Sequence, residues 1–312
     1  MDATPSVRLP ADAHASGIPE RPPRPITLRG ATLAWGTRTF VMGILNVTPD
    51  SFSGDGLLTG VSRDAALDSA LEQGRQMAAE GADLLDVGGE STRPGHPSVD
   101  EAEELQRVIP VIKAVRKALP EMPISIDTIK PSVARAALDA GADLINDVWG
   151  TGPSEAMARV AAERDVPYVI SHNREEAIYR SVVGEVIADL QGAVERAVRV
   201  GCAWELLIVD PGIGFGKTAE QNLELLRDLA AVSVLGRPIL LGTSRKSTIG
   251  KVLDLPADQR VEGTLATTAL GIWAGVDIVR VHDVAANLRA ARMSDAVVRG
   301  GWHAPVQASA TR

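Results

Sequence analysis

The sequence of 312 residues predicts one (β/α)₈ barrel over residues 26–300, for three reasons. Eight short, β-rich apolar runs recur along the chain, stretches with helical periodicity separate them, and polar residues gather where the runs end. Near-continuous apolar strands that alternate with helices are typical of a parallel sheet covered by helices. Eight such units over about 260 residues fit a closed barrel better than an open doubly wound sheet.

The first 25 residues have neither an apolar period nor the hydrophobic core of a signal peptide. They contain six prolines, Pro5, Pro10, Pro19, Pro22, Pro23 and Pro25. We predict that residues 1–25 form a disordered extension. Residues 301–312 also lack a period and are predicted to be a tail.

The next segment, ITLRGATLAW from Ile26, alternates like a β-hairpin with its turn at Arg29-Gly30. A hairpin placed directly before the first barrel strand is expected to close the N-terminal end of the barrel. The apolar run FVMGILN then follows as that first strand.

Each predicted barrel strand ends at a recognisable residue. The eight ends are Asn46, Gly88, Asp127, Asp147, His172, Asp210, Thr243 and His282. Helical period is clearest after the second strand, at Val108, Ile112, Val115 and Leu119. There, Ser98 and Glu101 have the spacing of a capping box and predict the start of the helix.

Composition excludes several classes of protein. Hydrophobic residues make up 45% of the chain and charged residues 23%, which is enough apolar material for a large core. The net charge of −8 disfavours binding to nucleic acid, and no apolar run is long enough to cross a membrane. The single cysteine, Cys202, is interpreted as a small core residue. We therefore expect a soluble cytoplasmic protein with neither nucleic-acid nor membrane partners.

Active sites of (β/α)₈ barrels lie at the carboxyl ends of the strands, where this sequence concentrates its polar residues. The basic ones are Arg93, Lys217, Arg245, Lys246, Arg280 and His282. A positive mouth in an acidic protein suits a small anionic substrate, and the loops after the last two strands often bind phosphate.

Three acceptor-bearing groups, Asp127, Asn146 and Asp210, are expected to face the same interior space. A flat heterocycle with an amino-amidine edge would supply the donors that buried carboxylates and an amide require. Residues such as Asp210 and Asn146 are also common in turns and caps, and that interpretation stays open.

Several familiar motifs fail on inspection. The segment PGIGFGKT does not have the glycine spacing of a phosphate loop. The five histidines lack metal-ligand spacing, which disfavours a zinc site. No serine sits in a G-x-S-x-G turn, so covalent catalysis is not favoured. The small and apolar segment GTLATTALGIWAGV predicts a helix packed closely on the barrel, or a subunit interface.

Seven segments, in order, together resemble the dihydropteroate synthase family. They are NVTPDSFS, GGESTRPG, SIDTIKP, INDV, DPGIGFGK, TSRKSTIG and RVHDV, and they span residue 42 to about residue 285. The family condenses 6-hydroxymethyl-7,8-dihydropterin pyrophosphate with 4-aminobenzoate to give 7,8-dihydropteroate and pyrophosphate. The resemblance implies a Mg²⁺-dependent transferase of folate synthesis that forms a homodimer. It also implies a target of the sulfonamides.

The resemblance also implies roles for individual residues. The pterin site would comprise Asp127, Asn146, Asp210, Gly214, Phe215 and Lys246. The pyrophosphate would meet Asn46, Arg93, Arg280 and His282, with Asn46 also helping to hold Mg²⁺. The aminobenzoate would contact Phe52, Thr92, Pro94 and Ser244. The groups expected to act in catalysis are Arg93, Asp127, Lys246, Arg280 and His282.

Two segments depart from the family pattern. The first loop reads SFSGDGLL where SFSDGG is common, and the fifth strand ends in Ser171-His172 where a Met-His pair is usual. One alternative is therefore a paralogue with lost or changed activity. Another is a methyltransferase that uses methyltetrahydrofolate and a corrinoid, which would share the pterin carboxylates but need no pyrophosphate ligands. A third is a pterin-binding barrel without catalysis.

Overall fold

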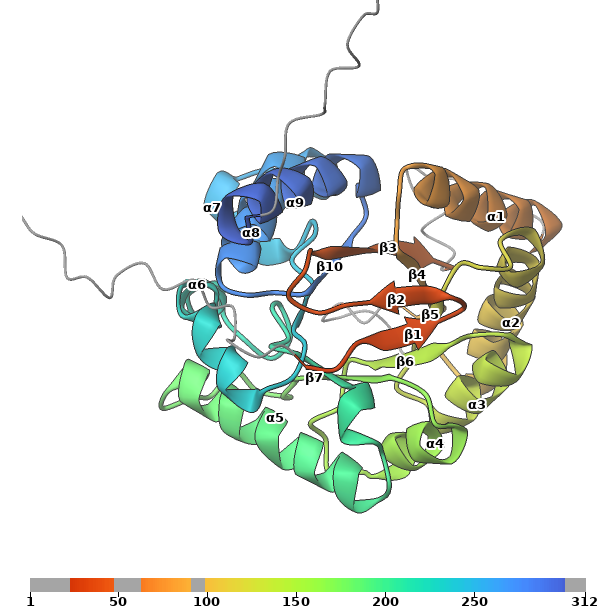
Figure 1. The fold of residues 1–312 in the computed structure, drawn as a ribbon, viewed down its shortest axis with the longest axis horizontal. Coiled ribbons are helices and arrows are strands. Elements are labelled where there is room, and N and C mark those ends of the chain that lie inside the picture. The colour runs from red at the N-terminus through yellow and green to blue at the C-terminus, as the bar shows by residue number, and fades with distance from the viewer. Residues whose placement is uncertain (1–22, 48–62, 91–98, 301–312) are drawn as a thin grey trace, which may run out of the picture.

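The computed structural model describes residues 23–47, 63–90 and 99–300, and it confirms the predicted barrel. Eight parallel strands form a ring surrounded by helices (Figure 1). The barrel strands are β3 (Phe40–Asn46), β4 (Leu84–Gly88), β5 (Ile124–Asp127), β6 (Leu144–Asp147), β7 (Tyr168–Ser171), β8 (Leu207–Asp210), β9 (Leu240–Leu241) and β10 (Ile278–Val281).

Helices follow the strands in the order expected of a (β/α)₈ chain. They are α1 (Arg63–Ala79), α2 (Glu101–Ala118), α3 (Pro131–Ala140), α4 (Ala156–Arg164), α5 (Val182–Arg199), α6 (Ala219–Arg227), α7 (Ser247–Leu253), α8 (Val261–Trp273) and α9 (Val284–Val298). The described residues also include the short 3₁₀ helices η2 (Trp204–Leu206), η3 (Leu229–Leu235) and η4 (Ala257–Gln259). Strand β9 is followed by two helices, α7 and α8.

The sheet runs in the order β8-β7-β6-β5-β4-β3-β10-β9. Its two edges meet where Val209 pairs with Ile239 and the Val209 N–H donates to the Pro238 carbonyl at 2.9 Å. This isolated bridge between β8 and the residue before β9 closes the ring.

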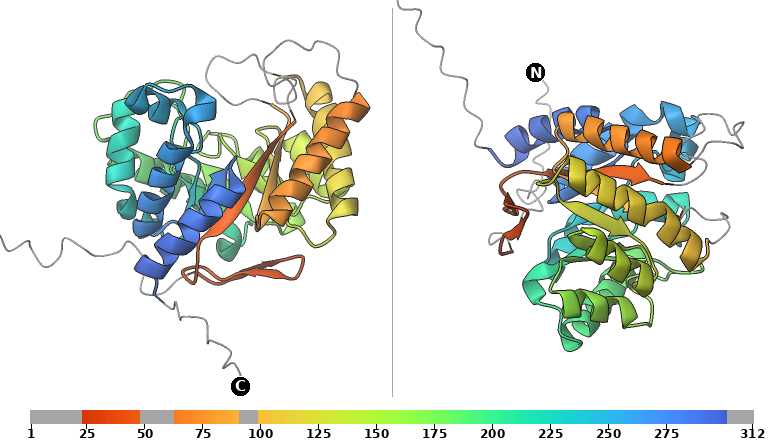
Figure 2. Two further views of the ribbon diagram at one scale, coloured as in Figure 1. Left: turned by 90° about the horizontal axis from the view of Figure 1, so that it is seen from above. Right: turned by 90° about the vertical axis from the view of Figure 1, so that its right-hand side faces the viewer.

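A hairpin closes the N-terminal end of the barrel, as predicted. Strands β1 (Ile26–Leu28) and β2 (Ala31–Leu33) are antiparallel, and Arg29 and Gly30 form the turn with positive φ. The hairpin lies across one end of the ring (Figures 1 and 2). Its exit is fastened by Asp277, whose carboxylate accepts from the N–H groups of Gly36 (3.2 Å) and Ile239 (3.1 Å).

Apolar side chains form two cores because successive strand residues point to opposite faces. The outer core, between strands and helices, includes Val41, Leu45 and Leu85. The inner core fills the lower half of the barrel with Phe40, Met42, Leu84, Leu144, Val169, Ile208, Leu240 and Ile278, capped by Ile26, Leu33 and Trp35 from the hairpin and its exit. Strand residues that continue the inner set toward the carboxyl ends therefore face the site.

The predicted strand ends agree with the structure to within two residues, since β7 and β10 end one residue early and β9 two residues early. The predicted cap of α2 is wrong. The N-cap is Asp100, whose carboxylate accepts from the Glu103 N–H at 2.7 Å, because aspartate caps as well as serine does. Ser98, residues 1–22 of the predicted extension and the tail 301–312 lie outside the described residues.

One strand carboxylate is directed into the outer layer. Asp147 accepts hydrogen bonds from the Tyr168 hydroxyl and from the Trp149 N–H, both at 2.9 Å. Burial raises the pKa of Asp147 to about 6. A carboxyl whose pKa is higher in the folded than in the unfolded chain costs stability that grows as the pH rises from about 4 to about 6.

We expect Asp147→Asn to be more stable than the wild type at pH 8, because the amide keeps an acceptor for Trp149 and offers a donor to the Tyr168 hydroxyl. The upper bound of the gain is about 3 kcal/mol, from 1.36 kcal/mol for each unit of pKa. Thermal melts at pH 8 and pH 4.5 measure it, with exposed Asp68→Asn as the control. A gain in Tm that is equal at both pH values would contradict the assignment.

Candidate functional site

The inward residues at the carboxyl ends of the strands lie side by side. In the sheet register Asn46 is level with Gly88, Gly88 with Asp127, and Asp127 with Asn146. Across the barrel, Ser171 is level with Asp210. The expected convergence of Asp127, Asn146 and Asp210 on one interior space is thus what the register produces.

Directly below this row, Arg280 joins two strands through ion pairs. Its Nε donates to Asp86 Oδ2 at 2.5 Å, and a terminal nitrogen donates to Asp127 Oδ2 at 2.6 Å. Asn146 completes the group, because its Nδ2 donates to the same Asp86 oxygen at 3.0 Å. The four side chains come from β4, β5, β6 and β10 and form one connected polar layer above the inner apolar core.

Several acceptors in this layer are buried and have no hydrogen-bond partner among the described residues. They are Asp86 Oδ1, Asp127 Oδ1 and Asn146 Oδ1, with the hydroxyl of Ser125 beside them on β5. Buried acceptors without partners are costly, and a cluster of them marks a place where a ligand supplies the donors. The layer therefore fits a polar, donor-rich molecule.

Burial dominates the electrostatics of the site. It raises the pKa of Asp127 to about 7 against the opposing charge of Arg280, and it raises the pKa of Asp210. Burial also lowers the pKa of Lys246 to about 8. Groups that titrate near neutrality in a concave interior are characteristic of functional sites.

The loop after β8 brings Asp210, Phe215 and Lys246 together. The Gly212 N–H donates to Asp210 Oδ1 at 2.7 Å, and Lys246 Nζ donates to the Ile213 carbonyl and lies 4.1 Å from the centre of the Phe215 ring. Gly214 has φ of 85°, and a Cβ there would lie 2.9 Å from the Lys246 stem. Only glycine lets the lysine pass between this loop and the barrel interior.

Two more predicted residues meet at the ends of β9 and β10. The Ser244 hydroxyl lies 2.9 Å from His282 Nδ1 and accepts from the His282 N–H at 3.1 Å. Arg245, which the sequence placed in a positive mouth, instead forms an ion pair with Asp283 at 2.5 Å. With Arg280 also paired, much of the expected positive charge is balanced by carboxylates within the described residues.

Four predicted residues cannot be placed. Phe52, Thr92, Arg93 and Pro94 lie outside the described residues, whereas Asn46 is described at the end of β3. The described part of the chain holds no group of three or more His, Cys, Asp or Glu side chains able to bind a metal ion.

Sequence reasoning missed Asp86 and gave Ser171 no role in the site. A signal existed for Asp86, since it is a charged residue within an apolar run and has the same inward parity as Leu84 and Gly88. Ser171 has the same parity as Val169, and its hydroxyl donates to Asp210 Oδ2 at 3.4 Å.

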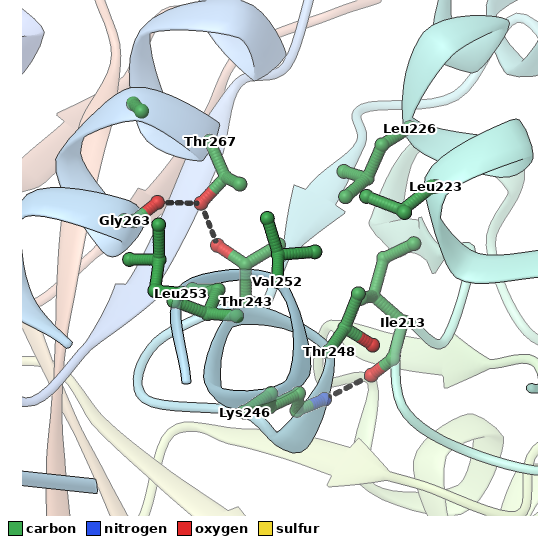
Figure 3. A pocket seen from close by; sticks show the side chains of 12 residues that line it. Ile213, Leu223, Leu226, Thr243, Lys246, Thr248, Val252, Leu253, Gly263 and Thr267 are labelled. Carbon is green, nitrogen blue, oxygen red and sulfur yellow. Dashed lines mark hydrogen bonds between the residues drawn. The ribbon is translucent and has the colours of Figure 1, made fainter. Parts of the chain in front are cut away.

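A separate cavity of about 170 Å³ lies outside the barrel, between α6, α7 and α8. Its walls are mostly apolar, with Leu223 and Leu226 facing Val252 and Leu253, and Lys246 at one edge (Figure 3). This cavity lacks the carboxylate cluster and is not the polar site inside the barrel. None of the described helices is long and apolar enough to span a bilayer.

Comparison with known proteins gives consistent matches over most of the chain. Residues 42–282 match the family model described as pterin binding enzyme. The dihydropteroate synthase of Clostridium beijerinckii is 50% identical over 265 residues, which cover 85% of this chain and 96% of the relative.

Similar solved structures are also dihydropteroate synthases. A dihydropteroate synthase from Clostridium difficile, determined in the presence of pteroic acid, is 51% identical with a TM-score of 0.80 and covers 85% of this chain and 98% of that one. The Xanthomonas albilineans dihydropteroate synthase with 4-aminobenzoic acid is 42% identical, with a TM-score of 0.80 and coverage of 88% and 98%.

We expect Arg280→Met to destabilise the fold in a pH-dependent manner. Without the guanidinium, the pKa of Asp127 rises further, so the buried Asp127 carboxyl lowers the stability of the fold most when it is ionised. Urea unfolding should give a loss of about 3–5 kcal/mol at pH 8 and a smaller loss at pH 5.5. Arg159→Met, which breaks an exposed pair with Glu155, is the control. A loss that does not vary with pH would refute the coupling.

Proposed function

The chain belongs to the family of pterin-binding enzymes, and from this membership we propose how its residues act as those of a dihydropteroate synthase. The reaction condenses 6-hydroxymethyl-7,8-dihydropterin pyrophosphate with 4-aminobenzoate and releases pyrophosphate. The observation that supports it best is the buried row of acceptors at Asp86, Asp127 and Asn146 that lack donors within the described residues.

The pterin ring satisfies these acceptors. Its amino group and adjacent ring N–H are donors, which suit Asp127 Oδ1 and Asn146 Oδ1, and Asp210 meets the ring from the opposite side of the barrel. Lys246 and Phe215 pack together beside Asp210, offering a cation and an aromatic surface to the heterocycle. Gly214 lets Lys246 reach this position.

Arg280 has two roles in this proposal. Its ion pairs with Asp86 and Asp127 use two of the five N–H donors of the guanidinium, and the others are assigned to the pyrophosphate. His282 and Arg93 are proposed as further phosphate ligands. Because His282 Nδ1 contacts the Ser244 hydroxyl, the neutral ring carries its proton on Nε2 when that hydroxyl donates.

The residues fit a Mg²⁺ ion that is held mainly by substrate. Mg²⁺ prefers oxygen ligands and commonly binds through one protein group plus phosphates and water. Asn46 offers an amide oxygen at the end of β3, in the row that contains Asp127. When bound, the ion would neutralise the charge of the departing pyrophosphate. Ser244, with Phe52, Thr92 and Pro94, is proposed to hold the aminobenzoate.

The chemistry is a dissociative displacement. The bond between the pterin methylene carbon and the pyrophosphate oxygen breaks first, and Arg280 and His282 stabilise the leaving group. Asp127 and Asp210 place negative charge beside the ring, which favours the cation that forms on the methylene carbon. The amine nitrogen then attacks that carbon and loses a proton, so no side-chain nucleophile is required.

Two alternatives are less well supported. A methyltransferase that uses methyltetrahydrofolate has no need of phosphate ligands, whereas Arg280 lies on β10, His282 directly follows that strand and Lys246 follows β9. A paralogue without activity would be expected to lose part of the set, yet Asp127, Asn146, Asp210 and Lys246 all converge. The single, buried Cys202 supports a reducing compartment, and we propose the cytoplasm.

Purified protein with the pterin pyrophosphate and Mg²⁺ should release pyrophosphate only when 4-aminobenzoate is present, and the product should have the mass of dihydropteroate. Chelation of Mg²⁺ should stop the release. Asp127→Asn should lower kcat/KM about 10- to 100-fold, since a charge-assisted hydrogen bond to the ring is lost.

Asp165→Asn is the matched control for this experiment, because Asp165 is exposed and caps α4 at the opposite end of the barrel. Pterin binding without product in the folded wild type would point to the inactive paralogue. Turnover with methyltetrahydrofolate and a corrinoid would instead support the methyltransferase.

We also propose that the chain forms a homodimer through α8. The buried face of this helix includes Thr264 and Thr268 as well as Ile272, while Ala266, Leu270 and Trp273 face outward. Leu270 is 62% exposed and Trp273 42%. Leu223 on α6 and Val252 on α7 extend this exposed apolar surface around the cavity of Figure 3. A second copy of the same face would cover it.

Leu270→Glu should convert the dimer into a monomer, because it places charge at the centre of the apolar face. Light scattering after size exclusion should give twice the chain mass of 32.9 kDa for the wild type and the single mass for the variant. Ile178→Glu, at an exposed apolar residue outside α8, should stay dimeric. A monomeric wild type would exclude the proposed interface.

A further inference from the structure

The loops after β7 and β8 are joined backbone to backbone. Gly212 has φ of 69°, and a Cβ there would lie 1.8 Å from the His172 carbonyl oxygen. Gly216 has φ of 54°, and its Cβ would lie 2.3 Å from the Arg174 carbonyl oxygen. The Tyr179 hydroxyl also donates to the Gly216 carbonyl at 2.9 Å. A side chain at either glycine would collide with the facing loop, so the two loops are positioned as one unit.

Lys217 connects the two loops through hydrogen bonds of its side chain. Its Nζ lies 2.9 Å from His172 Nδ1, 3.0 Å from the Gly212 carbonyl and 3.1 Å from the Phe215 carbonyl. An ammonium group has three protons and no acceptor, so these three partners use all of its donors. Burial lowers the pKa of Lys217 to about 7.

His172 connects this lysine to a carboxylate on α5. Because Nδ1 accepts from Lys217, the proton of the neutral ring is on Nε2, which lies 3.1 Å from Asp189 Oδ2. Arg174 holds Asp189 through its Nε at 2.9 Å and a terminal nitrogen at 2.7 Å. Burial, reinforced by the charge of Lys217, lowers the pKa of His172 to about 4, so the ring is neutral at physiological pH.

The fastened loop carries the pterin-site groups. Gly212 donates through its backbone N–H to Asp210 Oδ1 and accepts through its backbone carbonyl from Lys217. The Phe215 peptide also accepts from Lys217, while the Phe215 ring stacks on Lys246. The positions of Asp210 and Phe215, the two groups of this region proposed to contact the pterin, therefore depend on where Lys217 holds the backbone.

We infer that Lys217 and His172 form a positioning pair that sets the affinity for the pterin substrate without touching the reacting atoms. The inference rests on the proposed function of the site. It predicts an effect confined to one substrate, because the pair acts on Asp210 and Phe215, and the hydrogen bonds described for it do not involve Ser244 or His282, which follow β9 and β10.

Lys217→Met removes the donors and keeps the length of the side chain. Steady-state kinetics should show KM for the pterin pyrophosphate raised about 10- to 100-fold, as expected when charge-assisted hydrogen bonds are lost. KM for 4-aminobenzoate and kcat at saturation should stay within about threefold. Lys113→Met on the exposed face of α2 is the control and should match the wild type.

His172 supplies the second arm of the test. His172→Leu should reproduce the Lys217→Met effect, and the double variant should be no worse than either single variant, because the residues act as one pair. His172→Asn retains an acceptor near Nδ1 and should recover most of the pterin affinity. If Lys217→Met does not fold, the two His172 variants decide the question.

An unchanged KM for the pterin substrate in folded Lys217→Met would overturn the inference. So would equal losses for both substrates, which indicate a general disturbance of the fold. An inactive wild type would instead refute the proposed function, so the two failures are distinguishable.

Discussion

The ion pairs of Arg280 with Asp86 and Asp127 are the interaction on which the site depends. Two carboxylates buried side by side repel each other, and the guanidinium between them supplies the opposite charge that lets both remain in the interior. Asn146 is held through Asp86, so the orientation of the amide follows from the same contact. Below this layer the barrel is filled by apolar side chains, which offer these charged groups no hydrogen bonds.

The location of each group on strand or loop divides the work of the enzyme. Asp127, Asn146 and Asp210 project from strands of the closed ring, which would give the proposed pterin site a rigid, preorganised surface. Among the groups proposed for the pyrophosphate and the amine, Ser244 and His282 follow the ends of β9 and β10. In barrels of this kind the strands fix one part of a site and the loops after them vary the rest.

Much of this arrangement follows from local sequence. Asn46, Asp127 and Asp210 end apolar runs, and such residues mark the carboxyl ends of barrel strands, so the row of the site was predictable. The pairing of Arg280 with Asp86 was not, because the partners are 194 residues apart and meet only when the ring closes. The pairing of Arg245 with Asp283 was missed as well, because these residues are 38 apart in the chain and meet only where β9 and β10 lie side by side. The start of α2 was misjudged because Ser98 and Asp100 are both good caps and the pattern alone does not choose between them.

The hairpin at the N-terminal end makes the barrel a vessel with one opening. Ile26, Leu33 and Trp35 seal the floor with apolar side chains, so the interior exchanges its contents only through the mouth formed by the loops. In the proposed function the pterin binds at these carboxylates, deeper than the aminobenzoate beside Ser244, and both would enter through the same mouth. The pterin would then have to arrive first, so the order of substrate binding would be a property of the plugged barrel.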